Sequence, residues 1–393
     1  MYSADKEKFI NPLMQLVKEG KVSESRINDA VSKILAVKFN LGLFENRYID
    51  VEKQGKDYGR SESKKLALDA ARESIVLLKN SVNLLPLDKK KYKKILVTGP
   101  NANNQALLGD WTFTQPDDHI TTILEGIQEH VGKDCEIVFS NSGRIKGKKS
   151  DVTVNTTDPV TQQQALKEGG ELNDFAIKDA TEKAKDCELA IVAVGGYGIR
   201  SEWGLRTYGE SADRPSIDFY GKQEELIRNI QATGTPVIVV IVNGKPLNNI
   251  WVTENIPTIV DIWEPGMYGG KALAEILFGD VNPSGKLPIT IPQSAGQVPM
   301  YYYQTQSRYT TGYGLGSIRA DDRPAFAFGH GLSYTTFEYG KPTVNDTIMQ
   351  KDKDITVSFN ITNTGKIAGY ETAFCFVRDE VSSVVTPLQL LKG

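Results

Sequence analysis

The sequence of 393 residues is poor in the residue types that build disulfide frameworks and metal sites. Its three cysteines are odd in number and show no C-x-x-C spacing, and its three histidines lack the spacing of metal ligands. We therefore expect no disulfide framework, no metal and no cofactor. The cysteines are interpreted as buried structural thiols: Cys135, Cys187 and Cys375.

Long apolar runs and an excess of charge of one sign are also missing. No run approaches the roughly 18 apolar residues that a membrane-spanning helix needs, so we expect no membrane partner. The 46 Lys and Arg residues are scattered among 49 Asp and Glu residues, which leaves no basic stripe for phosphates and predicts no nucleic-acid partner. The first residues, MYSADKEKF, contain no apolar signal-peptide core, so the compartment stays open.

What the sequence does contain is a series of short β-branched runs. These are KILVTG, CEIVFS, LAIVAVGG, PVIVVIVNG and PTIVDIW. Helical patterns lie between most of them, over residues 173–186, 220–232 and 267–277. Strands that are apolar throughout are typical of a parallel sheet covered by helices on both faces. The middle of the chain is therefore predicted to be a parallel α/β sandwich domain.

The two ends of the chain show other patterns. Residues 23–41 carry an apolar stripe of helical spacing that follows a serine N-cap and stops at a glycine, and a second helix is expected over residues 62–79. After about residue 335, apolar and polar residues alternate around an Asn-Thr-Gly turn, as in a β-sandwich. The first helix has nothing obvious to pack on, and the sandwich has only two or three strands. We expect both ends to belong to incomplete domains.

The loops after the strands form the rim at which such sheets bind ligands. Four of these loops are GPNANN, GGYGIRSE, NGKP and WEPG. The glycines of GGYG resemble the start of a dinucleotide fingerprint, but Ser201 stands where the third glycine belongs and no helix pattern follows. Nucleotide binding is therefore not favoured.

One stretch on this rim, LRTYGESADRPSIDF, places Glu210, Asp213 and Arg214 within five positions. A carboxyl group can protonate a leaving oxygen when burial or a like charge raises its pKa toward neutrality. A neighbouring aspartate would favour that role and a neighbouring arginine would oppose it, unless the two pair and fix the loop. Glu202, on the same rim, is the competing acid. An ordinary solvated turn is the alternative interpretation.

Trp111 is the second candidate on the rim. It stands in LLGDWTFTQPDD, a loop flanked by glycine and polar residues, where a core tryptophan is not expected. An aromatic face on a polar loop suits the apolar side of a sugar ring, although tryptophans in such places also cap cores.

Five segments together resemble glycoside hydrolase family 3, the group of β-glucosidases and β-xylosidases. They are ARESIVLLKNSVNLLPL, LLGDWTFTQ, ESADRPSIDFYGKQEELI, WEPGMYGGKALAEILFGDVNPSGKLPITIP and FAFGHGLSYTTFEY. The resemblance runs from about residue 9 to the end of the sequence.

The resemblance implies a plan of domains, because members of the family have a (β/α)8 barrel, an α/β sandwich and often a fibronectin-III-like domain. It implies the last helices of a barrel at 1–45, a linker at 46–62, an α/β sandwich domain at 63–300, a connecting segment at 301–334 and the start of a fibronectin-III-like β-sandwich at 335–393. Most of the barrel and the end of the fibronectin-like domain are expected to be absent.

The resemblance also implies a reaction, the retaining hydrolysis of terminal nonreducing β-linked sugars by an Asp nucleophile and a Glu acid/base. Glu210 occupies the acid/base position, with Ser211 where glycine is usual and Glu202 as the second candidate. Trp111 resembles the tryptophan beside the leaving-group subsite. The nucleophile belongs to a Ser-Asp-Trp-like motif of the barrel that this sequence lacks, so the chain alone is expected to be inactive.

The supporting residues and partners follow from the same resemblance. Asp213 and Arg214 are expected behind the acid/base. The expected partners are a β-linked oligosaccharide or aryl glycoside and the missing barrel, in the same chain or a second one, and a homo-oligomer is allowed. A periplasmic or secreted location is slightly favoured. Glucoside and xyloside specificity stay open.

Two other functions remain open. A non-catalytic carbohydrate-binding or interaction protein derived from the same family would bind glycans without hydrolysing them. An unrelated nucleotide-using α/β protein would be stabilised against heat by a nucleotide.

Overall fold

The computed structural model describes residues 5–52, 59–112, 115–140, 174–198, 206–305, 323–348, 350 and 352–393. It divides into two compact units, residues 1–64 and 65–393. No helix in these ranges combines the length and the apolar character that crossing a bilayer requires.

The first unit contains α1 (Lys6–Lys18) and α2 (Glu24–Asn40). The predicted serine N-cap of α2 is confirmed, since the Ser23 side chain accepts a hydrogen bond from the Arg26 amide at 3.2 Å. No residue of α2 is buried, and Ile34 on its apolar stripe is 59% exposed. The stripe that predicted this helix therefore finds no cover within the unit.

The second predicted helix is shorter than expected. The helix α4 covers Ser61–Ser74, and the chain then forms the strand β1 (Val76–Asn80). The prediction of a helix through residue 79 was wrong because VLLKN is a strand at the edge of a sheet, where its first three residues are buried. Apolar residues this close together satisfy a helical and an extended pattern equally well.

The core of the second unit is a six-stranded sheet in the order β1-β6-β5-β4-β2-β3. All five predicted strands are present, and they pair in parallel, whereas the edge strand β1 pairs antiparallel with β6. The sheet is therefore mixed. The five parallel strands are β2 (Lys94–Thr98), β3 (Glu136–Ser140), β4 (Leu189–Gly195), β5 (Val237–Val242) and β6 (Thr258–Trp263).

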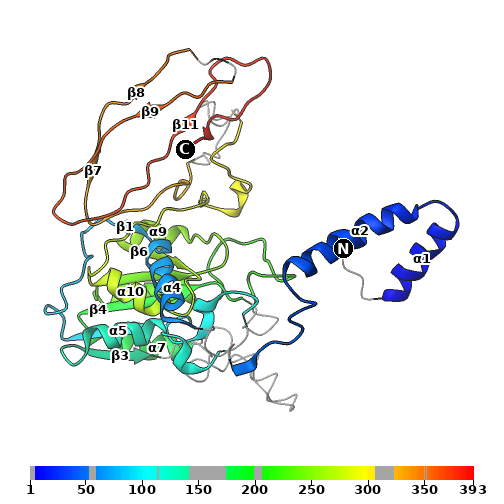
Figure 1. The fold of residues 1–393 in the computed structure, drawn as a ribbon. Coiled ribbons are helices and arrows are strands. Elements are labelled where there is room, and N and C mark those ends of the chain that lie inside the picture. The colour runs from blue at the N-terminus through cyan, green and yellow to red at the C-terminus, as the bar shows by residue number, and fades with distance from the viewer. Residues whose placement is uncertain are drawn as a thin grey trace. The chain divides into compact units, whose positions relative to one another are not determined.

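Helices cover both faces of this sheet, as expected of an α/β sandwich domain (Figure 1). On one face the buried side chains of α4, α5 (Ile123–Val131) and α10 (Gly269–Leu277) join one core cluster. On the other face, α7 (Asp174–Lys185), α8 (Gln223–Ala232) and α9 (Ile250–Asn255) join a second cluster. Each helix predicted within this domain is present.

The strand order reverses beside β2. From β2 the chain passes through α5 to β3 at the edge of the sheet and then returns to β4 on the opposite side of β2. The helix after β2 lies on one face of the sheet and the helix after β4 lies on the other. Loops that leave adjacent strands toward opposite faces open a crevice at the carboxyl ends of the strands, where α/β sheets bind ligands.

The segment after residue 335 forms short antiparallel pairs in the described residues. They are β7 (Phe337–Tyr339) with β10 (Ile361–Asn363), β8 (Thr343–Val344) with β9 (Val357–Ser358), and β11 (Phe376–Val377) with β12 (Leu390–Leu391). The strand β10 ends at Asn363, the first residue of the predicted Asn-Thr-Gly turn, and Gly365 donates its amide to the Asn363 side chain at 3.0 Å. A fibronectin-like arrangement of these strands stays a prediction.

Three short 3-10 helices complete the described elements: η1 (Gln105–Leu108), η2 (Asp117–His119) and η4 (Ala295–Gln297).

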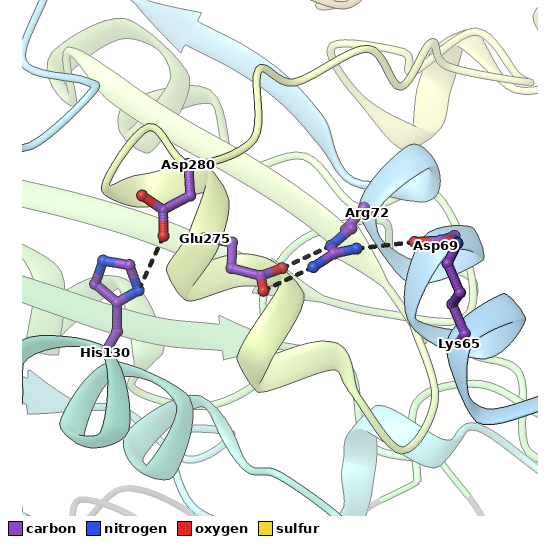
Figure 2. A network of polar contacts seen from close by, with 6 residues as sticks. All are labelled: Lys65, Asp69, Arg72, His130, Glu275 and Asp280. Atoms are coloured by element: carbon purple, nitrogen blue, oxygen red, sulfur yellow. Dashed lines mark hydrogen bonds and ion pairs between the residues drawn. The ribbon is translucent and has the colours of Figure 1, made fainter. Parts of the chain in front are cut away.

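An ion-pair network ties α4 to α10 on one face of the sheet (Figure 2). The Arg72 guanidinium donates to both carboxylate oxygens of Glu275, at 2.7 and 2.8 Å, and also to Asp69 at 2.8 Å. The hydrogen bond to the Glu275 carboxylate is the main cause of the raised pKa of Arg72. The pair is largely shielded from water, so it fixes the position of the exposed helix α4 on the sheet.

Candidate active site

The candidate site lies at the switch point, where the loops after β2, β4 and β6 meet. The loop after β2 carries Trp111 and the loop after β4 carries Glu210. The two predicted rim residues therefore lie in the loops that follow β2 and β4, the adjacent strands at which the strand order reverses. Glu202 lies outside the described residues.

The chain around Glu210 is a turn fastened to the end of β4. The Thr207 amide donates to the Tyr197 carbonyl at 2.8 Å, and the Tyr197 amide donates to the Thr207 hydroxyl at 2.9 Å. Within the turn itself, the Ala212 amide donates to the Gly209 carbonyl at 3.0 Å. The turn presents Glu210 as an exposed side chain.

Ser211 shows how tight this turn is. It adopts a φ of 60°, in the left-handed region that glycine occupies more easily. A residue without a side chain would adopt this conformation with less strain. The serine is accommodated at a cost in backbone strain.

Arg214 braces the turn from behind. Its Nε donates to the Arg206 carbonyl at 2.9 Å, and its guanidinium lies over the Tyr220 ring at 4.1 Å from the centroid. The Arg214 amide donates to the Thr207 carbonyl at 3.2 Å, which closes the turn. These contacts give Arg214 a loop-fixing role.

Lys245, from the loop after β5, holds the far side of the same segment. Its ammonium donates to the carbonyls of Arg214 at 2.9 Å and Ser216 at 3.1 Å. Burial lowers the pKa of Lys245, the nearby Asp213 carboxylate opposes that change, and the Arg214 charge adds to it. Asp213 itself is exposed. Its charge therefore acts on the lysine that supports the loop.

The tryptophan loop meets the glutamate loop through Asp110 and Gly209. A methyl group on Gly209 would overlap the Asp110 carboxylate, and a Cβ on Gly198 would stand 2.8 Å from Asp110 Oδ1. Trp111 follows Asp110 directly, with a φ of 58°, and is 66% exposed. In the sequence, Glu210 directly follows Gly209 and Trp111 directly follows Asp110. Both candidates are exposed on the loops that this contact joins.

Two residues beside this contact were missed from the sequence. Tyr208, which is 4% exposed, donates its hydroxyl hydrogen bond to Glu264 Oε1. Glu264 belongs to the WEPG loop after β6, which the strand pattern placed on the rim without assigning a residue. An acidic residue directly after a buried strand was the available signal for Glu264. Tyr208 gave no signal of its own.

A buried carboxyl group shapes the end of β6 before Glu264. Asp261 Oδ1 accepts hydrogen bonds from the Trp263 amide at 3.0 Å and from Asn243 Nδ2 at 3.2 Å. These bonds hold Trp263 at a φ of 52°, next to an irregularity in the pairing of β5 and β6. Complete burial raises the pKa of Asp261 from 3.8 to about 7.

The described residues contain no group of three or more His, Cys, Asp or Glu side chains that could hold a metal ion. The chemistry that the rim offers is that of a carboxyl group beside an aromatic face. A carboxyl group can give and take protons, and an indole can pack against the apolar side of a sugar.

The fold is thus an α/β domain, and the loops after β2, β4 and β6 meet at the point where its strand order reverses. A model of the Glycosyl hydrolase family 3 C-terminal domain matches residues 75–334. A β-xylosidase from Formosa agariphila is 38% identical over 375 residues, covering 93% of this chain and 47% of the relative. A periplasmic β-glucosidase from Salmonella typhimurium is 34% identical over 404 residues, covering 98% and 50%.

A solved structure shows the same likeness. A mutant β-glucosidase from Listeria innocua in complex with laminaribiose has a TM-score of 0.80 and 28% identity, over 97% of this chain and 49% of that one. The chain belongs to glycoside hydrolase family 3, as its motifs predicted. It matches a C-terminal portion and spans about half the length of the curated relatives it matches.

Proposed function

We propose that this chain is a segment of a retaining β-glycosidase that supplies the general acid/base, Glu210, and part of the leaving-group subsite, Trp111. The observation that carries the proposal is the contact of Asp110 with Gly209 at the switch point. This contact joins the loops that carry the acidic and the aromatic candidate, which lie 99 positions apart in the sequence.

The reaction divides the work between two carboxyl groups. Glu210 protonates the departing glycosidic oxygen while an aspartate attacks the anomeric carbon, and Glu210 then removes a proton from the water that releases the sugar. In retaining enzymes the two carboxyl groups stand roughly 5 to 5.5 Å apart. The aspartate is assigned to a barrel outside this sequence, for which residues 1–45 would be the last helices.

The substrate is a β-linked oligosaccharide or an aryl glycoside. The family relatives named as β-xylosidase and β-glucosidase, and the relative that binds laminaribiose, support this class. The exposed indole of Trp111 would pack on the sugar that leaves. We assign the residues that hold the nonreducing sugar to the barrel. The specificity for glucosides or xylosides is therefore expected to be set outside this chain.

The exposure of Glu210 fits this division. A lone carboxyl group in water has neither a second carboxyl group opposite nor a dry pocket to bind substrate, so it cannot supply the geometry of the reaction. We therefore expect no hydrolysis of a chromogenic β-glucoside by the homogeneous chain. Turnover by that preparation would contradict the missing-nucleophile proposal.

A barrel supplied as a second chain, or by fusion, tests the acid/base directly. Activity on a β-glucoside with a poor leaving group should fall about 100-fold or more in Glu210→Ala, since acid/base catalysis contributes roughly 100- to 10,000-fold. Glu129→Ala is the matched control, because Glu129 is an exposed glutamate in the last turn of α5, at the amino ends of the strands. Unchanged activity in Glu210→Ala would move the assignment to Glu202.

A non-catalytic carbohydrate-binding protein is the second candidate, favoured by the exposed face of Trp111. It predicts glycan affinity of the chain alone that is lost in Trp111→Ala, with no gain of activity when a barrel is supplied. Isothermal titration with laminaribiose separates the two functions.

A further inference from the structure

The ring of Tyr208 lies in a cradle of three glycines. A Cβ on Gly196 would stand 2.5 Å from Tyr208 Cε1, one on Gly244 would stand 2.5 Å from Cε2, and one on Gly198 would stand 3.0 Å from the hydroxyl. Real Cβ atoms essentially never show the two 2.5 Å approaches, so a side chain at Gly196 or Gly244 would displace the ring. Two glycines of the GGYG segment, Gly196 and Gly198, are explained by this packing, and Gly195 packs closely on the Val242 carbonyl.

The hydroxyl at the end of the ring is anchored to another loop. Tyr208 Oη donates to Glu264 Oε1, and a Cβ on Gly109 would stand 2.7 Å from Glu264 Oε2. Glu264 therefore contacts both the segment that leads to Glu210 and the segment that leads to Trp111. A hydrogen bond to a charged acceptor is among the stronger ones in proteins.

We propose that Tyr208 and Glu264 form a clamp that fixes the Glu210 turn on the rim and so sets the place of the acid/base. The inference rests on the proposed function. Both are positioning residues, since they act through the backbone of residues 207–214. Proton transfer tolerates little displacement of the donor, and a displacement of about 1 Å can cost about 100-fold in rate.

The first test uses the full chain and measures amide hydrogen exchange. Tyr208→Phe keeps the ring in its cradle and removes only the hydroxyl, so exchange over residues 206–214 should rise about tenfold while β4 stays protected. Tyr334→Phe is the control, because it removes a half-buried tyrosine hydroxyl that donates to the Ile276 carbonyl at 2.8 Å. It should leave residues 206–214 unchanged.

A pair of substitutions at Glu264 separates the clamp from general packing. Glu264→Gln retains an acceptor oxygen and should raise exchange of the turn less than Glu264→Leu, which retains none. Unchanged exchange in both Tyr208→Phe and Glu264→Leu would overturn the proposal. So would an equal rise in the turn and in β4, because it would show only a general structural role.

The second test uses the enzyme reconstituted with a barrel. Tyr208→Phe should lower kcat/KM about tenfold for a poor leaving group and hardly at all for a good one, the pattern of a misplaced acid. If Glu210→Ala shows that pattern and Tyr208→Phe does not, the clamp alone is wrong. If neither variant shows it, the proposed function is wrong.

Discussion

The sheet of the second unit and the helix α2 were both predicted from their apolar residues but differ in what covers them. Ile191 in β4 is 0% exposed, with strands on both sides and helices on both faces. Ile34 in α2 is 59% exposed. The pattern of apolar residues thus predicts an element correctly in both regions, while burial, which supplies the stabilisation, depends on partners that the pattern does not contain.

The largest expected effect separates the two regions by paired substitutions. Ile191→Ala should lower the free energy of unfolding by about 2–5 kcal/mol, because it leaves a cavity between strands and helices. Ile34→Ala should change it by less than about 0.5 kcal/mol, because the side chain is already in water. Urea unfolding followed by circular dichroism measures both. Equal losses would show that the α2 stripe is covered and would break the comparison.

The second expected effect concerns Asp261, an ionisable side chain that is buried inside the sheet. With its pKa raised to about 7, the folded chain holds a proton between about pH 4 and pH 7 that the unfolded chain has lost. The free energy of unfolding therefore falls as pH rises through this window, and the loss is complete above it. Asp261→Asn keeps an acceptor for the Trp263 amide and does not ionise.

The measurement is the difference in unfolding free energy between Asp261→Asn and the unsubstituted chain. The free energy of unfolding of the variant should rise relative to that of the unsubstituted chain by about 1–4 kcal/mol from pH 4 to pH 8. Glu225→Gln, at an exposed carboxyl group of α8, is the control and should give a flat difference. A flat difference for Asp261→Asn would show that its charged form is well solvated.

The smallest of these effects concerns the ion pair that joins α4 to the sheet domain. Arg72→Met leaves the half-buried Glu275 without its bidentate partner and should cost about 1–3 kcal/mol in unfolding free energy. Lys65→Met, in the exposed pair of the same network, should give no measurable change (Figure 2). A similar loss in both variants would contradict the difference in burial between the two pairs.

The sheet was predictable because its signals are local. Five parallel strands and their helices follow from apolar runs of the right length, and the serine N-cap of α2 follows from one residue. The strand β1 was not predictable as such, since VLLKN follows helix α4 almost directly and its pairing with β6 and with Leu332 selects the extended form. Neighbours from a distant part of the chain decided that assignment.

The sequence names the candidate residues of the site, which stay predictions, but it does not predict the contacts that hold their loops. Glu210 and Trp111 stand out by residue type in loops that follow strands. The cradle around Tyr208 combines glycines from the loops after β4 and β5, and the bond to Glu264 adds the loop after β6. Such contacts need the sheet order, which the sequence pattern leaves open.

The central claim is that Glu210 gives a proton to the leaving group, and a leaving-group series tests it most directly. In the barrel-reconstituted enzyme, Glu210→Ala should lower kcat/KM steeply as the pKa of the aryl leaving group rises, because poor leaving groups depend most on protonation. In the same Glu210→Ala variant, azide should speed release of the sugar from substrates with good leaving groups, because azide is a nucleophile that needs no base. A dependence on leaving-group pKa identical to that of the unsubstituted enzyme would contradict the claim.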